Sequence, residues 1–309
     1  MPISYSSALA AAKDAAASQH YPTSTLFMVA TPIGNLADIS LRALCALDLM
    51  DAIACEDTRH TQHMLSAYGI KKPLIALHQH NEMHASDALV SRLQQGQRIA
   101  YVSDAGTPGI SDPGAKLAAA VHAAGLRVIP MPGASSVTTL ISAVGLSEAR
   151  DQFNTQGFLF AGFLPNKGSS RLQALQALRD SSRTVVLLEA PHRLNQLAKE
   201  LLPWGDRLVT TGRELTKQFE SINTHACQDF EAWLLADANR LRGEYVLAIH
   251  PLPAQVSGGE DDIPANVLST LATLLEVLPV KTASQVGSTI TGVSKNKLYA
   301  AALAMQARV

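Results

Sequence analysis

Residues 99–114 read IAYVSDAGTPGISDPG, a short apolar stretch that runs directly into a loop rich in turn-forming residues. We expect residues 99–102 to form a strand. Two aspartates, Asp104 and Asp112, stand in the loop among glycines and prolines. Glycine permits a close approach of the backbone to a ligand, and proline fixes φ. Ligands of α/β proteins bind at the carboxyl ends of strands, so this loop predicts the floor of a small-molecule pocket.

The same alternation of apolar runs and helical spacing extends on both sides of this loop. Continuous apolar runs indicate strands that are buried on both faces. Short strands that alternate with helices indicate a parallel, mostly doubly wound sheet. We expect strands at 26–30, 52–55, 74–77, 99–102 and 127–129, and helices at 41–48, 61–68, 85–95, 114–124 and 137–144.

From residue 151 the expected strands become longer and fit a mixed sheet in a second α/β domain; they lie at 157–163, 184–188, 207–212 and 246–249. A stretch rich in proline, glycine and acidic residues follows and indicates a linker. We therefore expect a flexible N-terminal tail (1–24), an N-terminal α/β domain (25–148), a C-terminal α/β domain (149–250), a linker (251–264) and a helical module (265–309). For the tail, a short frayed helix is the alternative.

The helical module is predicted to resemble a helix-turn-helix unit, with the turn at residues 291–294. Lys281, Lys295 and Lys297 lie on or near its last helix. These lysines leave two interpretations open. They either contact a nucleic acid or are ordinary surface residues.

The composition of the chain argues against several classes of protein. The chain has 309 residues, 17% charged residues and a formal net charge of −1, so it lacks a global basic field. Its three cysteines are scattered and show no disulfide or zinc spacing. No stretch approaches about 18 uncharged apolar residues, and the N-terminus lacks the features of a signal peptide. We expect a cytoplasmic protein with no membrane segment.

Polar residues also follow the other expected strands, in clusters at 56–60, 133–136, 189–193 and 213–217. Such clusters at strand ends are typical of an active-site rim. For residues 56–60 the alternative is a helix start capped by Asp57 or Thr58. The histidines at 78, 80 and 84 lack a cysteine or carboxylate partner at ligand spacing, so we expect no metal.

Several nucleotide and hydrolase motifs are missing. TPIGNL follows the first strand where a dinucleotide-binding protein has GxGxxG, and the chain contains neither a P-loop nor a GxSxG elbow. The loops 103–114 and 133–136 carry acids and hydroxyls instead. They suit a ligand with hydroxyls, an amino-acid moiety and an adenine edge.

Eight collinear motifs carry a family resemblance: TPIGNLADIS (31–40), ACEDTRHT (54–61), HQHNE (78–82), VSDAGTPGISDPG (102–114), PGASS (132–136), GFLP (162–165), EAPHR (189–193) and RELTK (213–217). Together they resemble the ribosomal RNA small-subunit methyltransferase I family. Its members are S-adenosylmethionine-dependent enzymes of the tetrapyrrole-methylase (class III) fold. The match spans roughly residues 26–250, and the helical tail resembles the small C-terminal module of many members.

The resemblance implies two α/β domains with S-adenosylmethionine in the cleft between them, and a homodimer. It also implies a reaction, the methylation of the 2′-hydroxyl of a cytidine in 16S ribosomal RNA, near the decoding centre of the small ribosomal subunit. The positions that it implies for cofactor binding are Pro32, Asp104, Thr107, Ile110, Ser135, Ser136, Ala190 and Leu215.

A ribose hydroxyl is a poor nucleophile at neutral pH, so a base near it should help. We expect catalytic roles for Glu56, Asp57 and Arg59, with Glu56 or Asp57 as the base. Arginine suits contacts to phosphate, and we expect Arg59 to share the contacts to phosphates and substrate. The other residues that we expect to bind substrate are His60, Arg193, Arg213 and Lys217. The alternative for each charged residue is an ion pair at an interface.

Two other functions stay open. The same fold could methylate a small porphyrinoid whose carboxylates meet the cationic rim. A non-enzymatic RNA-binding or assembly protein could also keep the pocket as a vestige. The ribosomal-type motifs and the helical tail argue against the first, and the intact Asp104 and Ser135–Ser136 argue against the second.

Overall fold

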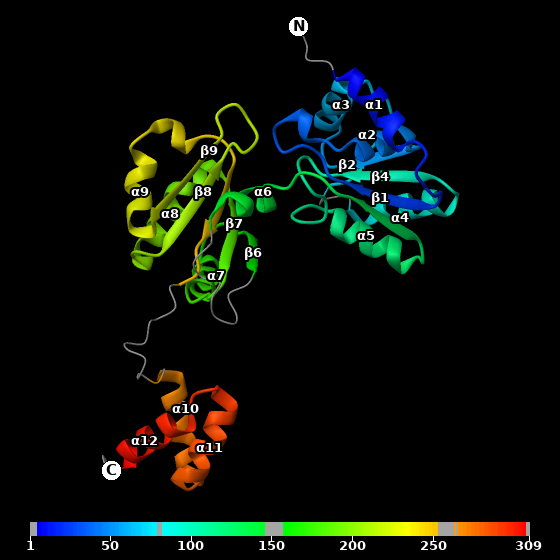
Figure 1. The fold of residues 1–309 in the computed structure, drawn as a ribbon. Helices are drawn as coiled ribbons and strands as arrows, with labels where there is room; N and C mark the ends of the chain where they lie inside the picture. The colour runs from blue at the N-terminus through cyan, green and yellow to red at the C-terminus, as the bar shows by residue number, and fades with distance from the viewer. Residues whose placement is uncertain (1–4, 79–81, 146–156, 253–262, 264, 307–309) are drawn as a thin grey trace. The chain divides into compact units, whose positions relative to one another are not determined.

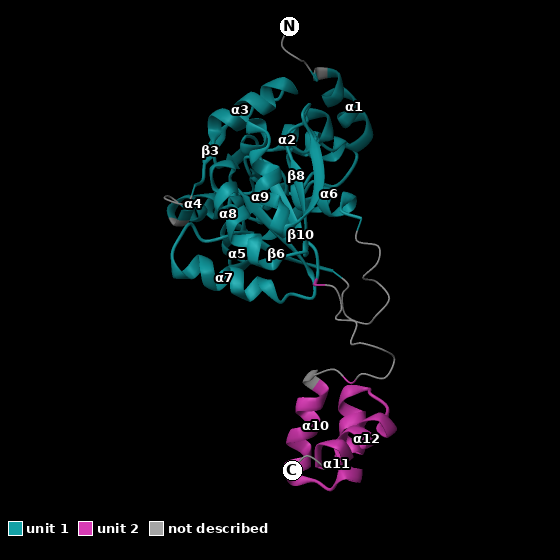
Figure 2. Cartoon of the chain, turned by 90° about the vertical axis from the view of Figure 1, so that its left-hand side faces the viewer, with its two compact units in different colours: residues 1–251 teal, residues 252–309 magenta. Residues whose placement is uncertain are grey.

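The computed structural model describes residues 5–78, 82–145, 157–252, 263 and 265–306. The chain divides into two compact units, residues 1–251 and 252–309 (Figure 2). The predicted boundary between the α/β domains, at 148/149, lies outside the described residues, as does most of the predicted linker.

The first sheet has the strand order β3-β2-β4-β1-β5, and all its neighbours are parallel. Its strands are β1 (Thr25–Val29), β2 (Ala52–Cys55), β3 (Leu74–Ala76), β4 (Arg98–Val102) and β5 (Arg127–Met131). β2 and nearly all of β1 and β4 are buried, as their continuous apolar runs predict. The prediction of a parallel, doubly wound sheet is confirmed.

Helices cover both faces of this sheet (Figure 1). On one face lie α1 (Ser6–Ala16), α2 (Leu41–Leu49) and α3 (Thr58–Ala67), and on the other α4 (Glu82–Gln94) and α5 (Gly114–Ala123). Alternate residues of β1 serve the two faces: Phe27 packs in the cluster under α2, and Leu26 in the cluster under α4 and α5. We call this sheet with α1–α5 the first lobe.

Helix α1 lies in the segment for which we expected a flexible tail, with a short helix as the alternative. Ala12 and Ala16 are buried against the first-lobe core, and Lys13 forms an ion pair with Asp48 of α2 at 2.8 Å. Alanine favours helix and lets two helices approach closely. The segment has no wide stripe of large apolar residues, so its packing partner could not be read from the sequence.

The second sheet is mixed, with the strand order β6-β7-β10-β8-β9. Only β6 and β7 pair in parallel; the other pairs are antiparallel. The strands are β6 (Phe158–Phe163), β7 (Thr184–Glu189), β8 (Leu208–Arg213), β9 (Ser221–Ala226) and β10 (Tyr245–Ile249). The predicted mixed sheet is confirmed, but we did not predict β9. It is a half-exposed edge strand of sequence SINTHA, whose polar residues hide the strand pattern.

One face of this sheet is covered by α7 (Ser169–Arg179), α8 (Leu194–Leu201) and α9 (Cys227–Leu235). We call this sheet with α7–α9 the second lobe. Short 3-10 helices also connect the larger elements of the two lobes, among them Leu36–Asp38, Pro191–Arg193, Leu202–Trp204 and Ala238–Leu241.

Helix α6 (Ser136–Ala143) packs on the opposite face of the second sheet. Its Leu140 lies in one apolar cluster with Val186 of β7 and Val246 of β10. Figure 1 shows α6 beside β7. Ile33, from the loop after β1, joins the same cluster. This shared core ties the end of the first lobe to the second.

The second unit consists of α10 (Ala265–Val277), α11 (Val280–Thr291) and α12 (Lys295–Gln306). Leu271, Ala283 and Leu298 form its own small core. Gly292 ends α11 in the left-handed conformation, and the Ser294 hydroxyl accepts a hydrogen bond from the Lys297 N–H at 3.3 Å, as expected of an N-cap. None of the helices in the described ranges is long and apolar enough to span a bilayer.

Candidate active site

A cavity of about 540 Å³ lies in the first unit, and both lobes supply its walls. It sits at the carboxyl ends of β2, β4 and β7, where an α/β sheet binds its ligands. Eight of the residues predicted from sequence line it: Glu56, Asp104, Thr107, Ile110, Ser135, Ser136, Ala190 and Leu215.

The loop that follows β4 forms one wall, as predicted from its turn chemistry. Main-chain hydrogen bonds in both directions between Thr31 and Gly106, at 3.0 and 3.1 Å, fasten it to the end of β1. Asp112 folds the loop back, because its carboxylate accepts from the N–H groups of Gly109 at 2.7 Å and Gly114 at 2.8 Å. Asp104 is left to face the pocket.

The turn at residues 133–136 forms the adjoining wall. The Thr107 hydroxyl donates to the Ala134 carbonyl at 3.0 Å and so locks this turn to the β4 loop. A Cβ on Gly133 would lie 2.9 Å from the Cβ of Ala30, so the turn approaches β1 as closely as only glycine allows. Ser135 and Ser136 then line the pocket at the start of α6.

The two candidate bases occupy different environments. Asp57 is the N-cap of α3: its carboxylate accepts from the N–H groups of Arg59 at 2.8 Å and His60 at 3.3 Å. These bonds lower the pKa of Asp57. Glu56 lines the pocket instead, and burial, with the charges of Asp104 and Asp112, raises its pKa to about 6.

In the second lobe, Leu215 reaches the pocket from a strained turn. Glu214 and Thr216, on either side of it, have φ of 50° and 67°, values that non-glycine residues rarely adopt. The Lys217 ammonium holds the turn, because it contacts the carboxylates of Glu214 at 3.0 Å and Glu244 at 3.1 Å. The Lys217 side chain also lies against Gly34 of the loop after β1.

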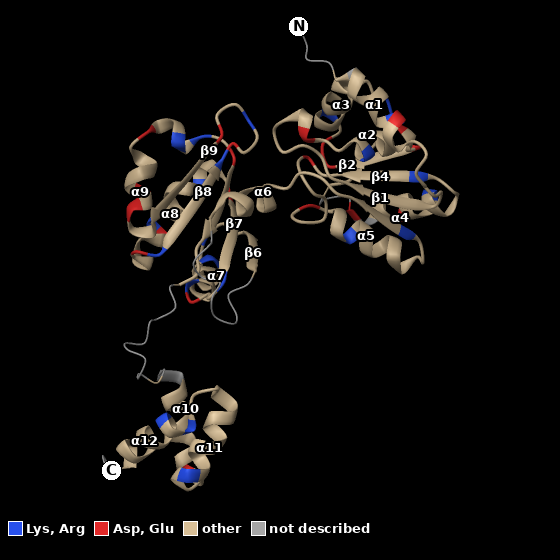
Figure 3. Ribbon diagram, viewed as in Figure 1, with Lys and Arg blue, Asp and Glu red and all other residues tan. Residues whose placement is uncertain are grey.

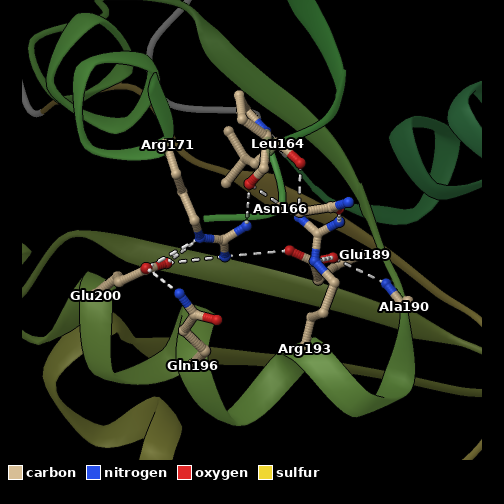
Figure 4. Close-up of polar contacts among 9 residues, drawn as sticks. Leu164, Asn166, Arg171, Glu189, Ala190, Arg193, Gln196 and Glu200 are labelled. Carbon is tan, nitrogen blue, oxygen red and sulfur yellow. Dashed lines mark hydrogen bonds and ion pairs between the residues drawn. The ribbon is translucent and has the colours of Figure 1, made fainter. Parts of the chain in front are cut away.

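Arg193 and Arg213 are also held by protein groups. The Arg193 guanidinium pairs with Glu189 at 2.9 Å and donates to the Asn166 side chain and the Leu164 carbonyl, both at 2.6 Å (Figure 4). Arg213 donates to the carbonyl of Arg242 at 2.8 Å. The expected substrate contacts of Arg193, Arg213 and Lys217 therefore compete with these partners.

Glu189, which lines the pocket, belongs to a buried ionic network that sequence analysis missed (Figure 4). Arg171 of α7 contacts Glu189 at 3.3 Å and Glu200 of α8 at 2.8 Å. With Arg193, the network holds two cations and two carboxylates. The sequence signal was weak, because Arg171 is one polar residue at the buried positions of an otherwise ordinary amphipathic helix.

The remaining predicted residues lie outside this cavity. Pro32 is buried beside it without lining it, and His60 is exposed on α3. Arg59 lines a separate groove. The wall also contains apolar residues that we did not predict, Ile33, Phe163, Leu188, Tyr245 and Val246. Most of these residues sit in strands, where nothing distinguishes them from ordinary core positions.

The described residues that line the cavity include five carboxylates and no lysine, arginine or histidine. Over the lobes as a whole, acidic and basic residues are interspersed along the chain (Figure 3). The acidic character is therefore local to the pocket. Glu189 and Glu244 are paired with cations, so Glu56, Asp104 and Asp112 are the carboxylates that favour a ligand with positive charge or hydrogen-bond donors.

Known proteins resemble this chain at the level of both sequence and fold. A family model described as Tetrapyrrole (Corrin/Porphyrin) Methylases matches residues 25–228, and one described as RsmI C-terminal HTH domain matches residues 261–306. The chain is 44% identical to a ribosomal RNA small subunit methyltransferase I of Escherichia coli O157:H7, over 91% of this chain and 95% of that one. It is 43% identical to the protein of the same name from Pseudomonas aeruginosa, over 92% and 98% of the two chains.

Among solved structures, the uroporphyrin-III C-methyl transferase of Thermus thermophilus complexed with S-adenyl homocysteine superposes with a TM-score of 0.51. The two share 16% sequence identity over 73% of this chain and 97% of that one. At this identity the likeness concerns the fold alone. It confirms the expected two-lobed methylase architecture.

Proposed function

Because the chain belongs to the ribosomal RNA small subunit methyltransferase I family of tetrapyrrole methylases, we propose a specific reaction for it. As a member of that family it is an S-adenosylmethionine-dependent methyltransferase of small-subunit ribosomal RNA. The reaction that we propose is the methylation of the 2′-hydroxyl of a cytidine in 16S ribosomal RNA, near the decoding centre.

The pocket suits S-adenosylmethionine in size and chemistry. Its volume of about 540 Å³ lies in the usual range for small-molecule sites. Its acidic groups complement a sulfonium and an ammonium, and its apolar wall offers a surface for the adenine. The residues that would hold the cofactor are Asp104, Thr107, Ile110, Ser135, Ser136, Ala190 and Leu215, with Pro32 fixing the loop beside them.

Once bound, S-adenosylmethionine supplies a methyl group that is already activated by its sulfonium. The protein then has to align the ribose oxygen and remove its proton. We assign Glu56 as the base that accepts this proton. Its raised pKa of about 6 leaves it ionised at neutral pH yet more basic than an ordinary carboxylate.

The single observation that supports this assignment is that the carboxylates of Glu56 and Asp57 lie in different environments. The sequence offers two adjacent carboxylates as the base, and it does not distinguish between them. Asp57 spends its carboxylate on the N–H groups of α3, whereas Glu56 lines the pocket. A carboxylate that faces the cavity favours Glu56 as the proton acceptor.

The porphyrinoid alternative is less well supported. A tetrapyrrole substrate carries several carboxylates and needs cations near the pocket. The described lining contains none, and Arg193 and Lys217 are already paired with carboxylates. The small ribosomal subunit as partner and a homodimer belong to the proposal, the homodimer on the family resemblance alone.

One experiment tests the reaction directly. The protein is incubated with labelled S-adenosylmethionine and small ribosomal subunits from a strain that lacks this methyltransferase, and the label is mapped after nuclease digestion. We expect label on the ribose oxygen of one cytidine. Label on a base, on another nucleotide or on no RNA at all would contradict the proposal.

A further inference from the structure

A second concavity lies on the first lobe, close to the active site. It is an open groove of about 410 Å³, lined by Thr58, Arg59 and Gln62 from the first turns of α3 and by Lys72 and Leu74 at the start of β3. Figure 2 shows α3 and β3 as neighbours on the surface of the first unit. The groove therefore brings together two cations that are separated in the sequence.

These two cations differ from the others near the active site. Arg193 and Lys217 are paired with carboxylates, and Arg213 donates to a carbonyl. Among the described residues, neither Arg59 nor Lys72 takes part in an ion pair. The neighbouring Asp57 carboxylate is bonded to the N–H groups of α3.

The groove is also close to the proposed base. Glu56 lines the pocket and Thr58 lines the groove. Two residues of extended chain span at most about 7 Å. A nucleotide whose ribose reaches Glu56 would therefore bring the adjoining sugar-phosphate chain to the mouth of the groove.

The lining chemistry matches a phosphodiester chain. A guanidinium contacts phosphate oxygens through a planar fork, and an ammonium acts as a point charge. Thr58 and Gln62 add side chains of the kind that hydrogen-bond to phosphate and sugar oxygens.

We propose that Arg59 and Lys72 bind the phosphate backbone of the ribosomal RNA beside the nucleotide that is methylated. This inference rests on the proposed function. Of the two roles expected for Arg59, it keeps phosphate contact and drops the catalytic one, and it adds Lys72, which was not among the expected site residues. The contact fixes the position of the RNA strand without reading its sequence.

The test compares Arg59→Ala and Lys72→Ala with Lys71→Ala in the full-length protein. Lys71 is an exposed neighbour that does not line the groove, so its removal changes the net charge equally. Binding to small ribosomal subunits from the methylase-deficient strain is measured over a salt series. We expect each groove variant to bind roughly tenfold more weakly and to show a salt slope shallower by about one.

Two further readouts separate binding from chemistry. We expect S-adenosylmethionine affinity and melting temperature to stay at wild-type values in both groove variants, and KM for subunits to rise more than kcat falls. Arg59→Lys should keep the salt slope. Groove variants that behave like Lys71→Ala would overturn the proposal. A fall in kcat with unchanged subunit binding would overturn it as well, because Arg59 would then act on the chemical step.

The failure of this inference is distinguishable from failure of the proposed function. The wild-type protein alone reports on the reaction, through label on the RNA. The groove is judged only by how the variants differ from wild type and from Lys71→Ala in binding. A protein that methylates the cytidine with unchanged binding by both groove variants contradicts the groove and leaves the reaction standing.

Discussion

The carboxylate of Asp104 accepts a hydrogen bond from the main-chain N–H of Asp57 at 3.1 Å. The bond joins the loop after β4 to the turn after β2, which lie 47 residues apart in the chain. Asp104 thus faces the pocket and also fixes the turn that carries Glu56. The proposed cofactor wall and the proposed base are held in register by one side chain.

This dual role predicts that Asp104→Ala weakens S-adenosylmethionine binding. The variant loses a pocket carboxylate and a charge-assisted hydrogen bond, and bonds of this kind contribute about 1.5–3 kcal/mol. We expect the dissociation constant measured by calorimetry to rise at least tenfold. Asp14→Ala, on the exposed side of α1, is the matched control and should bind normally. Normal binding by Asp104→Ala would mean that the cofactor lies elsewhere.

Replacement of Glu56 by glutamine should affect turnover far more than cofactor affinity. General-base catalysis contributes about 10²–10⁴-fold, so we expect kcat to fall by at least about a hundredfold. In the wild type, kcat/KM should rise with pH through about 6, as the Glu56 carboxyl ionises. Glu56→Gln should remove that rise. A variant with wild-type turnover would exclude Glu56 as the proton acceptor.

The same raised pKa has a consequence for stability. The folded protein raises the pKa of Glu56 from 4.5 to about 6, so between these values it binds more protons than the unfolded chain. Stability contributed by this group is present below about 4.5 and is lost as the pH rises through 6. We therefore expect Glu56→Gln to raise the melting temperature at pH 7 to 8. The gain should vanish near pH 4, and a gain that persists there would contradict this origin.

The buried network behind the pocket predicts a large effect on folding. Arg171 is 1% exposed, and its removal would leave Glu189 with Arg193 alone and Glu200 without its cation. Breaking one partner of such a network costs about 3–5 kcal/mol. We expect Arg171→Met to lower the free energy of unfolding, measured in urea, by that amount. Lys199→Met breaks an exposed pair with Glu231 and should cost about 1 kcal/mol or less. Similar losses in both variants would show that burial adds nothing to the Arg171 network.

Gly133 offers a test of the serine turn. A Cβ there would clash with the Cβ of Ala30 at 2.9 Å, and the backbone cannot shift without moving Ser135 and Ser136. We expect Gly133→Ala to weaken cofactor binding on the order of tenfold. The double variant with Ala30→Gly removes the clashing atom and should restore affinity. Failure of this rescue would mean that the close approach of the turn to β1 is not the cause.

Much of the fold could be predicted from the sequence, because local residue patterns specify its strands and helices. Continuous apolar runs such as residues 52–55 mark strands that are buried on both faces, and polar clusters after them mark the carboxyl edge of the sheet. Strand β9 escaped prediction because it is an edge strand whose alternating polar residues resemble a loop. The packing of helix α1 was not predicted, because its small buried face is formed only by contact with α2.

Some features of the candidate site could likewise be predicted from the sequence, whereas others depend on the tertiary structure. The linear order of residues was enough to bring the 103–114 loop, the 133–136 turn and Glu56 to one edge, because parallel strands all end there. Only the tertiary structure shows which charged side chains are already bonded to other protein groups. Asp57 and Glu56 are adjacent in sequence, yet only the three-dimensional arrangement makes one a helix cap and the other a pocket residue. Likewise Lys217 finds Glu244 and Arg193 finds Asn166, each 27 residues away. A hydrogen bond depends on distance and direction in space, which no spacing along the chain encodes.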